Sequence, residues 1–387
     1  MSSIFITGRS RKRGRLGVCC RAPTPYIPIV EHSQPPAPPG KISSGVFERV
    51  IRPRCGRMRG EVIVGPQSGV DVGVVDIGHD QVAVLTTDPL YIFPPFGWDR
   101  AAWCAIHIIA SDAFTSGIAP QYMSIDLTLP LDTDDRALES IWTAIHCACD
   151  DLGVAVVTGH TGRYEGCEFP IVGSATMIGI GPSGGYVVPS MARVGDHVIV
   201  TKGPAIEATA TLAAACPKLV GSRCGQDCLR QAQALLERMS VVDDAKAAIQ
   251  AGIHDRGVTS MHDATEGGLW NALAEVSRAC QCGMRVDRSQ IPMPQAVSEL
   301  CAAFNLDPFV SSSEGTLVIT CRPGKSADVI SILGQSGIEA AVIGEMCGKH
   351  SGVMVAEGAV LTELPNEFSD PFWPVLRQAL PEEATLG

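Results

Sequence analysis

The most informative single segment of the sequence is His262-Asp263-Ala264-Thr265-Glu266-Gly267-Gly268. A strand pattern over 258–261 comes before it and a helical pattern over 268–279 follows it, so Asp263 and Glu266 fall at a helix start. Acidic side chains alone would be ordinary caps there. The Gly267-Gly268 pair is more informative, because glycine is costly in a first helical turn and indicates close approach of something to the backbone. We therefore expect an anion-binding turn, with Asp263 and Glu266 as catalytic acids and both glycines beside a cofactor.

Three single carboxylates come before this segment. Asp71 ends the turn Gly65-Pro66-Gln67-Ser68-Gly69-Val70-Asp71, Asp88 follows the strand pattern 82–87, and Asp112 lies in a helix of small and apolar residues. A buried carboxylate costs several kcal/mol unless it is paired or metal-bound. Carboxylates that hold Mg²⁺ and glycine backbone against phosphate are the parts that phosphoryl transfer needs. We predict Asp71, Asp88 and Asp112 as magnesium ligands, Asp88 also as a catalytic group, and Gly65 and Gly69 as cofactor contacts; a simple turn cap is the alternative for Asp71.

A third glycine-flanked strand end is Val157-Thr158-Gly159-His160-Thr161-Gly162. Here Gly159 and Thr161 are candidate cofactor contacts. His160 is a candidate general base or phosphate donor, and an exposed histidine without a role is the alternative.

Composition limits the classes of partner. A chain of 387 residues with a formal charge of −11 and a pI near 5.3 has 41 acidic against 30 basic residues, which argues against a nucleic-acid or membrane surface. No run of about 18 apolar residues is present, so no membrane span is expected. The 15 cysteines are an odd number without a Cys-x-x-Cys pair, as expected for reduced thiols in a cytoplasmic protein.

The chain divides into four parts. Residues 1–43 are basic and proline-rich and are expected to be a disordered tail; organelle targeting or a mis-assigned start codon would explain the same composition. Short strand and helix patterns alternate over 44–183 and again over 184–355, with the turn Gly181-Pro182-Ser183-Gly184-Gly185 at the boundary. Residues 356–387 are expected to be a C-terminal tail. Both halves read as α+β, the first as a mixed sheet with helices on one face.

These motifs, in this order, resemble the superfamily of aminoimidazole ribonucleotide (AIR) synthase, the hydrogenase maturation protein HypE, thiamine-monophosphate kinase and selenophosphate synthetase. The matches are Asp71, Asp88, Asp112, Gly159-His160-Thr161 and Asp263 to Gly268, and HypE is the nearest member. The resemblance implies two AIR synthase-like domains, the first forming half of a dimeric β-barrel and the second α/β. It also implies a homodimer, an ATP site between the domains with Mg²⁺, and a small-molecule acceptor.

Departures from HypE bear on the reaction. HypE ends in a cysteine that accepts a carbamoyl group and is dehydrated with ATP to a thiocyanate, whereas the last cysteine here is Cys347. His160 stands where HypE usually has Asp, and Glu266 where it usually has Arg. We expect an ATP-dependent enzyme that activates a carboxamide, carbonyl or phosphate acceptor, with metallocentre maturation and a carbamoyltransferase-type partner left open. A nucleotide-binding accessory protein and a small-metabolite kinase are the alternatives.

Overall fold

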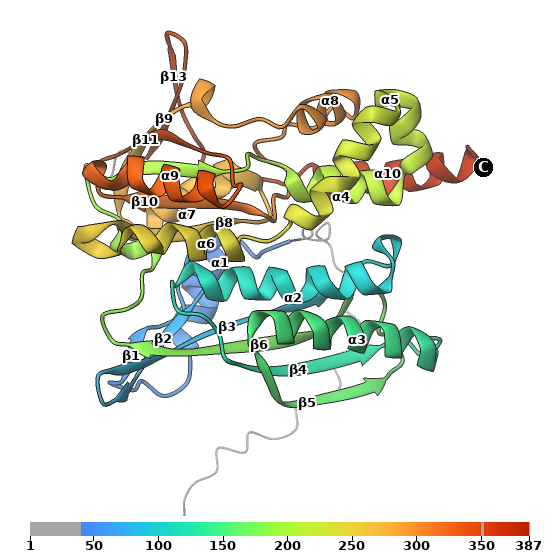
Figure 1. The fold of residues 1–387 in the computed structure, drawn as a ribbon, viewed down its shortest axis with the longest axis horizontal. Coiled ribbons are helices and arrows are strands. Elements are labelled where there is room, and N and C mark those ends of the chain that lie inside the picture. The colour runs from blue at the N-terminus through green and yellow to red at the C-terminus, as the bar shows by residue number, and fades with distance from the viewer. Residues whose placement is uncertain (1–39, 350–351, 387) are drawn as a thin grey trace, which may run out of the picture. The chain divides into compact units, whose positions relative to one another are not determined.

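The computed structural model describes residues 40–349 and 352–386. The first half of this region contains a six-stranded sheet in the order β1-β2-β3-β6-β4-β5. Helices α2 and α3 run along one face of it (Figure 1). The elements are α1 (Ser44–Val46), β1 (Val62–Val64), β2 (Gly73–Gly78), β3 (Gln81–Tyr91), α2 (Trp98–Thr115), β4 (Tyr122–Leu129), α3 (Asp135–Leu152), β5 (Ala155–Arg163) and β6 (Ile171–Pro182). The strands β4 and β5 are parallel and the other pairs are antiparallel, which confirms the expected mixed sheet with helices on one face.

Burial alternates along β3, so that one face of the strand is covered and the other is exposed. Val82, Val84, Thr86 and Leu90 are buried on the covered face, and Asp88 lies on that face with them. The strand continues to Tyr91, so Asp88 is inside β3 and not at its end as the sequence suggested. Beyond Leu85, β3 no longer pairs with β2 and has a free edge there, which tolerates Pro89 because proline has no N–H to donate.

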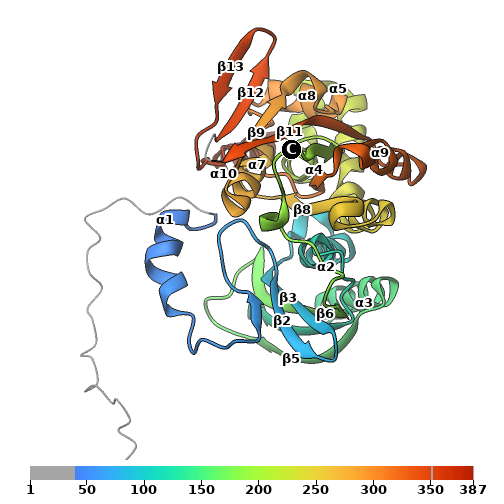
Figure 2. The ribbon, with the colours of Figure 1, turned by 90° about the vertical axis from the view of Figure 1, so that its left-hand side faces the viewer.

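The second half contains a seven-stranded sheet in the order β13-β12-β9-β11-β7-β10-β8. Its strands are β7 (His197–Thr201), β8 (Val258–Ala264), β9 (Cys282–Asp287), β10 (Thr316–Cys321), β11 (Ala340–Lys349), β12 (Val353–Glu357) and β13 (Val360–Glu363). The helices are α4 (Ile206–Ala215), α5 (Pro217–Ala234), α6 (Val242–Ala248), α7 (Gly268–Cys280), α8 (Gln295–Ala303), α9 (Ser326–Gln335) and α10 (Phe372–Thr385). The hairpin of β12 and β13 projects from the sheet (Figure 2).

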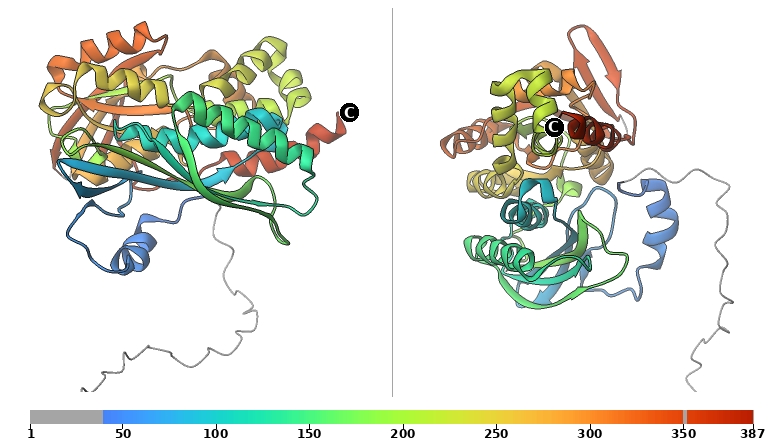
Figure 3. Two further views of the ribbon diagram at one scale, coloured as in Figure 1. Left: turned by 60° about the horizontal axis from the view of Figure 1, so that its bottom comes forward. Right: turned by 90° about the vertical axis from the view of Figure 1, so that its right-hand side faces the viewer.

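The segment expected to be a C-terminal tail is folded where the structure describes it. It contains β13 and α10, and α10 packs against α4 and α5 (Figure 3). Phe372 and Leu376 lie one helical turn apart and are both buried, so an apolar stripe holds the helix in place. Glu383, near its end, accepts hydrogen bonds from the backbone N–H groups of Lys218 and Leu219 at the start of α5.

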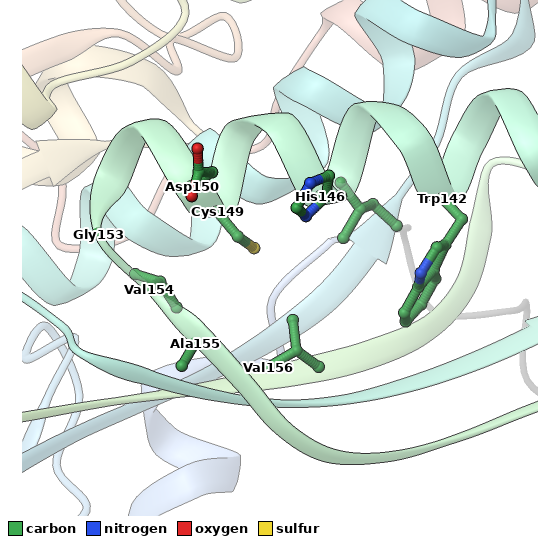
Figure 4. A pocket seen from close by; sticks show the side chains of 9 residues that line it. Trp142, His146, Cys149, Asp150, Gly153, Val154, Ala155 and Val156 are labelled. Atoms are coloured by element: carbon green, nitrogen blue, oxygen red, sulfur yellow. The ribbon is translucent and has the colours of Figure 1, made fainter.

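A groove of about 540 Å³ lies between α3 and β5. Figure 4 shows Trp142 and His146 on the helix above Ala155 and Val156 on the strand. Among the described residues β5 pairs only with β4, so this groove runs beside an open edge of the sheet. No helix of the described region is long and apolar enough to cross a membrane.

Candidate functional site

Four of the predicted acids meet where the first sheet and α2 approach β8 and α7. Thr86 on β3 joins two of them, because its Oγ1 donates to Asp112 Oδ2 at 3.1 Å or to the carbonyl oxygen of Asp71 at 2.9 Å. One ligand atom each of Asp71, His262 and Asp263 lies within 4.8 Å of the others. Asp88 joins them electrostatically, since its charge acts on Asp112.

Burial makes this cluster costly in the absence of a cation. Burial raises the pKa of Asp112 well above its ordinary value, and the charges of Asp263, Asp71 and Asp88 raise it further. Burial also raises the pKa of Asp88 and of Asp263 to about 7, with repulsion from Asp71 adding to both. At neutral pH the cluster therefore holds protons that a bound cation would displace.

The residues fit a hard divalent cation. Both carboxylate oxygens of Asp263 are buried and have no hydrogen-bond partner among the described residues. Carboxylate oxygens are the ligands that Mg²⁺ prefers. Asp71, Asp112 and Asp263 could hold such an ion, with Asp88 close by. A buried carboxylate with both oxygens free is otherwise hard to explain, because its desolvation is left uncompensated.

His262 ties the cluster to α7. Its Nδ1 is 2.7 Å from Asp71 Oδ2 and its Nε2 is 2.9 Å from Glu275 Oε2. Burial opposes a charge on this ring, but the two carboxylates outweigh burial and hold its pKa well above the usual value. Burial likewise opposes charge on Glu275, yet Lys41 and the hydrogen bond from His262 lower its pKa to about 2. The ring is thus a protonated bridge that donates to both carboxylates and orients Asp71.

Glu266, a predicted catalytic acid, lies at the rim of the cluster opposite a lysine from the start of the described chain. Lys41 Nζ is 3.8 Å from Glu266 Oε2 and donates to Thr265 Oγ1 at 2.8 Å. Half of the Lys41 side chain is exposed. Burial of its ammonium end lowers the pKa, but the charges of Glu275, Glu266, Asp71 and Asp112 raise it well above the ordinary value.

Three of the predicted turn glycines, Gly69, Gly267 and Gly268, are required by the conformation and packing of the chain itself. Gly267 and Gly268 have φ values of +78° and +66°, and a Cβ on Gly268 would lie 2.7 Å from the carbonyl oxygens of Phe309 and Ser311. Gly69, at φ +77°, lies against α7, where a Cβ would meet the Glu275 Cβ at 2.8 Å. The close approach inferred from Gly267-Gly268 is therefore made by residues 309–311. Cofactor contacts by these glycines and by Gly65 stay a prediction.

The third predicted group lies elsewhere, on the exposed face of the first sheet. Gly159, His160 and Thr161 belong to β5, and His160 Nε2 is 2.5 Å from the Tyr164 hydroxyl. A hollow of about 240 Å³ beside His160 is lined by neighbouring polar residues such as Asp126 and Thr176. Thr176 bonds to Thr87, whose side chain points away from that of Asp88 on the same strand. Within the described chain, His160 and the carboxylate cluster are thus on opposite faces of the sheet.

Sequence reasoning missed several members of the site. His262 and Glu275 form the bridge, Lys41 comes from a distant segment, and Glu207 and Glu314 extend the buried acids. Burial raises the pKa of Glu314 well above its ordinary value, and the charges of Asp263, Glu207, Asp112 and Asp88 raise it further. Burial also raises the pKa of Glu207 to about 8. Glu207 carried a usable signal, because it is the one acid in a helix of small apolar residues, the same pattern that identified Asp112.

Comparisons with known proteins agree with this architecture. Residues 69–181 match the family model "AIR synthase related protein, N-terminal domain", and residues 193–357 match "AIR synthase related protein, C-terminal domain". The chain is 28% identical over 308 residues to carbamoyl dehydratase HypE of Rhizobium leguminosarum bv. viciae, covering 75% of this chain and 83% of the relative.

Two solved structures show the same fold. The crystal structure of Escherichia coli HypE, a hydrogenase maturation protein, has a TM-score of 0.64 and 24% identity and covers 75% of this chain and 87% of its own. AaThiL complexed with AMPPCP and TMP has a TM-score of 0.59 and 20% identity and covers 74% and 87%. Because both family models match and together cover more than half of the chain, this chain belongs to the AIR synthase related protein family, and HypE is among its relatives.

Proposed function

We propose that this protein is a magnesium- and ATP-dependent enzyme that activates an oxygen atom of a small carboxamide, carbonyl or phosphate acceptor by phosphoryl transfer. The observation that carries the proposal is the Asp263 carboxylate, which is buried near Asp71 and Asp112 and has no hydrogen-bond partner on either oxygen among the described residues. AaThiL, with the same fold, is complexed with the nucleotide analogue AMPPCP, and this supports a triphosphate as the ligand.

The roles of the residues follow from their placement. Asp71, Asp112 and Asp263 would hold Mg²⁺, which when bound neutralises charge on phosphate oxygens. His262 fixes the Asp71 carboxylate by its 2.7 Å contact, and Glu275 holds the other side of the ring at 2.9 Å. Thr86 donates to Asp112 and so orients that carboxylate from the covered face of β3. Asp88, with a pKa raised to about 7 and not assigned to the metal here, would exchange a proton near neutral pH.

A fixed acceptor thiol is not favoured by the fold. Cys347, the cysteine with the highest number in the chain, lies in β11, where its Sγ faces the carbonyl oxygen of Glu345 at 3.7 Å. A side chain held in a central strand cannot swing to a distant phosphate. We therefore propose a diffusible acceptor, and we expect no ATP-dependent thiocyanate on the cysteines of this protein. AaThiL, complexed with TMP, keeps a small-metabolite kinase as the second candidate.

The function is tested by phosphate release with ATP and Mg²⁺ across carboxamide, carbonyl and phosphorylated acceptors, with mass measurement of the protein for adducts. Asp112→Asn removes one charge without changing shape and should abolish turnover. Asp126→Asn is the matched control, because Asp126 lies on the exposed face of the sheet beside His160. Equal loss in both variants would contradict the assignment, as would a thiocyanate adduct that depends on ATP and on Asp112.

A further inference from the structure

Residues 364–371, which we call the strap, connect β13 to α10 and contact both ends of α7. At one end the Arg278 guanidinium donates to the carbonyl oxygen of Asn366. At the other end Asp370 Oδ2 accepts from the backbone N–H of Gly267 at 3.2 Å and from Ser312 Oγ at 2.6 Å. Phe368 packs on the apolar core of the second sheet. Because α7 carries Glu275, the strap is attached to an element of the carboxylate site.

The strap also holds the beginning of the described chain. Glu367 Oε1 accepts from the backbone N–H of Ser44 at 2.8 Å and from Ser44 Oγ at 2.5 Å. These two bonds lower the pKa of Glu367, the hydroxyl bond most of all, so the carboxylate accepts them in its charged form at neutral pH. Lys41 lies three residues before Ser44, and Glu367 therefore anchors the segment from which Lys41 extends.

Among the contacts of residues 40–349 and 352–386, Lys41 presents a cation to the carboxylate site and uses one of its N–H donors. An ammonium group has three N–H donors. One is used by Thr265 Oγ1 at 2.8 Å, and Glu266 at 3.8 Å is an ion pair beyond hydrogen-bond distance. The charges of Glu275, Glu266, Asp71 and Asp112 act on the Lys41 ammonium, which is thus within electrostatic reach of the proposed metal ligands. Donors that are oriented by Thr265 and not consumed by carboxylates are available to a phosphate oxygen.

We infer that Lys41 contacts a phosphate of the nucleotide at this site and that Glu367, through Ser44, is the residue that positions it. This inference rests on the proposed function for the identity of the ligand. The segment expected to be a C-terminal tail thus contributes contacts to the site. It bonds to α7 at Gly267 and to the segment that carries Lys41 at Ser44.

Two titrations of the full chain test the inference, one with Mg²⁺·AMPPCP and one with Mn²⁺ alone. Lys41→Gln should weaken Mg²⁺·AMPPCP binding about tenfold or more, the worth of a hydrogen bond to a charged group. It should strengthen binding of Mn²⁺ alone about threefold to tenfold, because a neighbouring positive charge is removed. Glu367→Ala should change both affinities in the same directions. Glu367→Gln keeps an acceptor oxygen for Ser44 and should restore most of the nucleotide affinity.

The two affinities are expected to change in opposite directions. This separates a positioning role from a general loss of structure, since partial unfolding would weaken the binding of both ligands. Glu357→Ala is the matched control. Glu357 is an exposed acid at the end of β12 that pairs with Arg288, and its loss should change neither affinity. Unchanged or jointly weakened affinities in Lys41→Gln would overturn the inference. Wild-type protein that binds Mn²⁺ but no Mg²⁺·AMPPCP would overturn the proposed nucleotide function, and the Mn²⁺ titration would then still show whether Lys41 lies at the metal site.

Discussion

Replacing Asp263 with asparagine should stabilise the metal-free protein at alkaline pH, although it removes a residue of the proposed site. The side chain is 1% exposed and neither oxygen has a partner among the described residues. Burial raises its pKa from 3.8 to about 7. Between about pH 4 and about pH 7, a carboxyl group with a raised folded-state pKa binds more protons in the folded than in the unfolded state. The free energy of unfolding therefore falls as pH rises from about 4 to about 7.

The size of the effect follows from that shift. About three pKa units correspond to about 4 kcal/mol of destabilisation by Asp263 at pH 8, against about 1–2 kcal/mol at pH 5, where the unfolded state has only just lost its proton. A buried asparagine without partners costs about 1–3 kcal/mol at either pH. The stability of Asp263→Asn relative to wild type should therefore increase by about 2–3 kcal/mol from pH 5 to pH 8, with a net gain at pH 8.

Urea unfolding of both proteins in EDTA at pH 5 and pH 8 measures this difference. Addition of millimolar Mg²⁺ at pH 8 should stabilise the wild type and leave the variant unchanged, because a ligand that binds only the folded state stabilises it. The same relative stability at both pH values, or a variant that is less stable at pH 8, would refute the electrostatic argument for this carboxylate.

Three further predictions concern the rest of the chain. Phe372→Ala should lower the free energy of unfolding by about 3–5 kcal/mol in urea titrations, because Phe372 is fully buried at the start of α10; a loss under 1 kcal/mol would mean that α10 is not docked. Lys202→Met should cost about 3–5 kcal/mol, since it leaves Asp244 buried without its 2.8 Å partner, and a double variant with Asp244→Leu that fails to recover stability would contradict this pairing. The wild type should sediment as a dimer at micromolar concentration, because β5 has an open edge and the outer face of the first sheet is exposed; a monomer alone would refute it.

Local patterns predicted the order of helices and strands well, because apolar residues recur with a different period in a helix than in a strand. The strand pattern over 258–261 and the helical pattern over 268–279 correspond to β8 and α7, and the helix expected around Asp112 is α2. The end of β3 was misplaced because proline usually terminates a strand, whereas here the free edge beyond Leu85 tolerates Pro89. Residues 356–387 were expected to be a tail from the resemblance to HypE, whereas the structure places β13 and α10 there, with Pro381 inside the helix.

The site was predictable only where a carboxylate contrasted with its local surroundings. Asp112 stands among small and apolar residues, so its burial could be inferred from sequence. Asp263 was expected at a helix start, but it lies inside β8, which continues to Ala264, whereas α7 begins at Gly268. Glu275 and Lys41 could not be found in this way, because they reach the cluster through contacts across the fold: α7 against the loop at Gly69, and the first described residues against the strap. His160 was assigned to the site from its glycine neighbours, but the direction of its side chain depends on the register of β5 with β4.

Calorimetric titration of ATP into the protein tests whether the buried carboxylates form a magnesium-dependent nucleotide site. With millimolar Mg²⁺ we predict saturable binding that disappears in EDTA and is lost in Asp112→Asn but kept in Asp126→Asn. Absence of ATP binding with Mg²⁺, or binding that changes neither with EDTA nor in Asp112→Asn, would contradict the assignment of a magnesium-dependent nucleotide site.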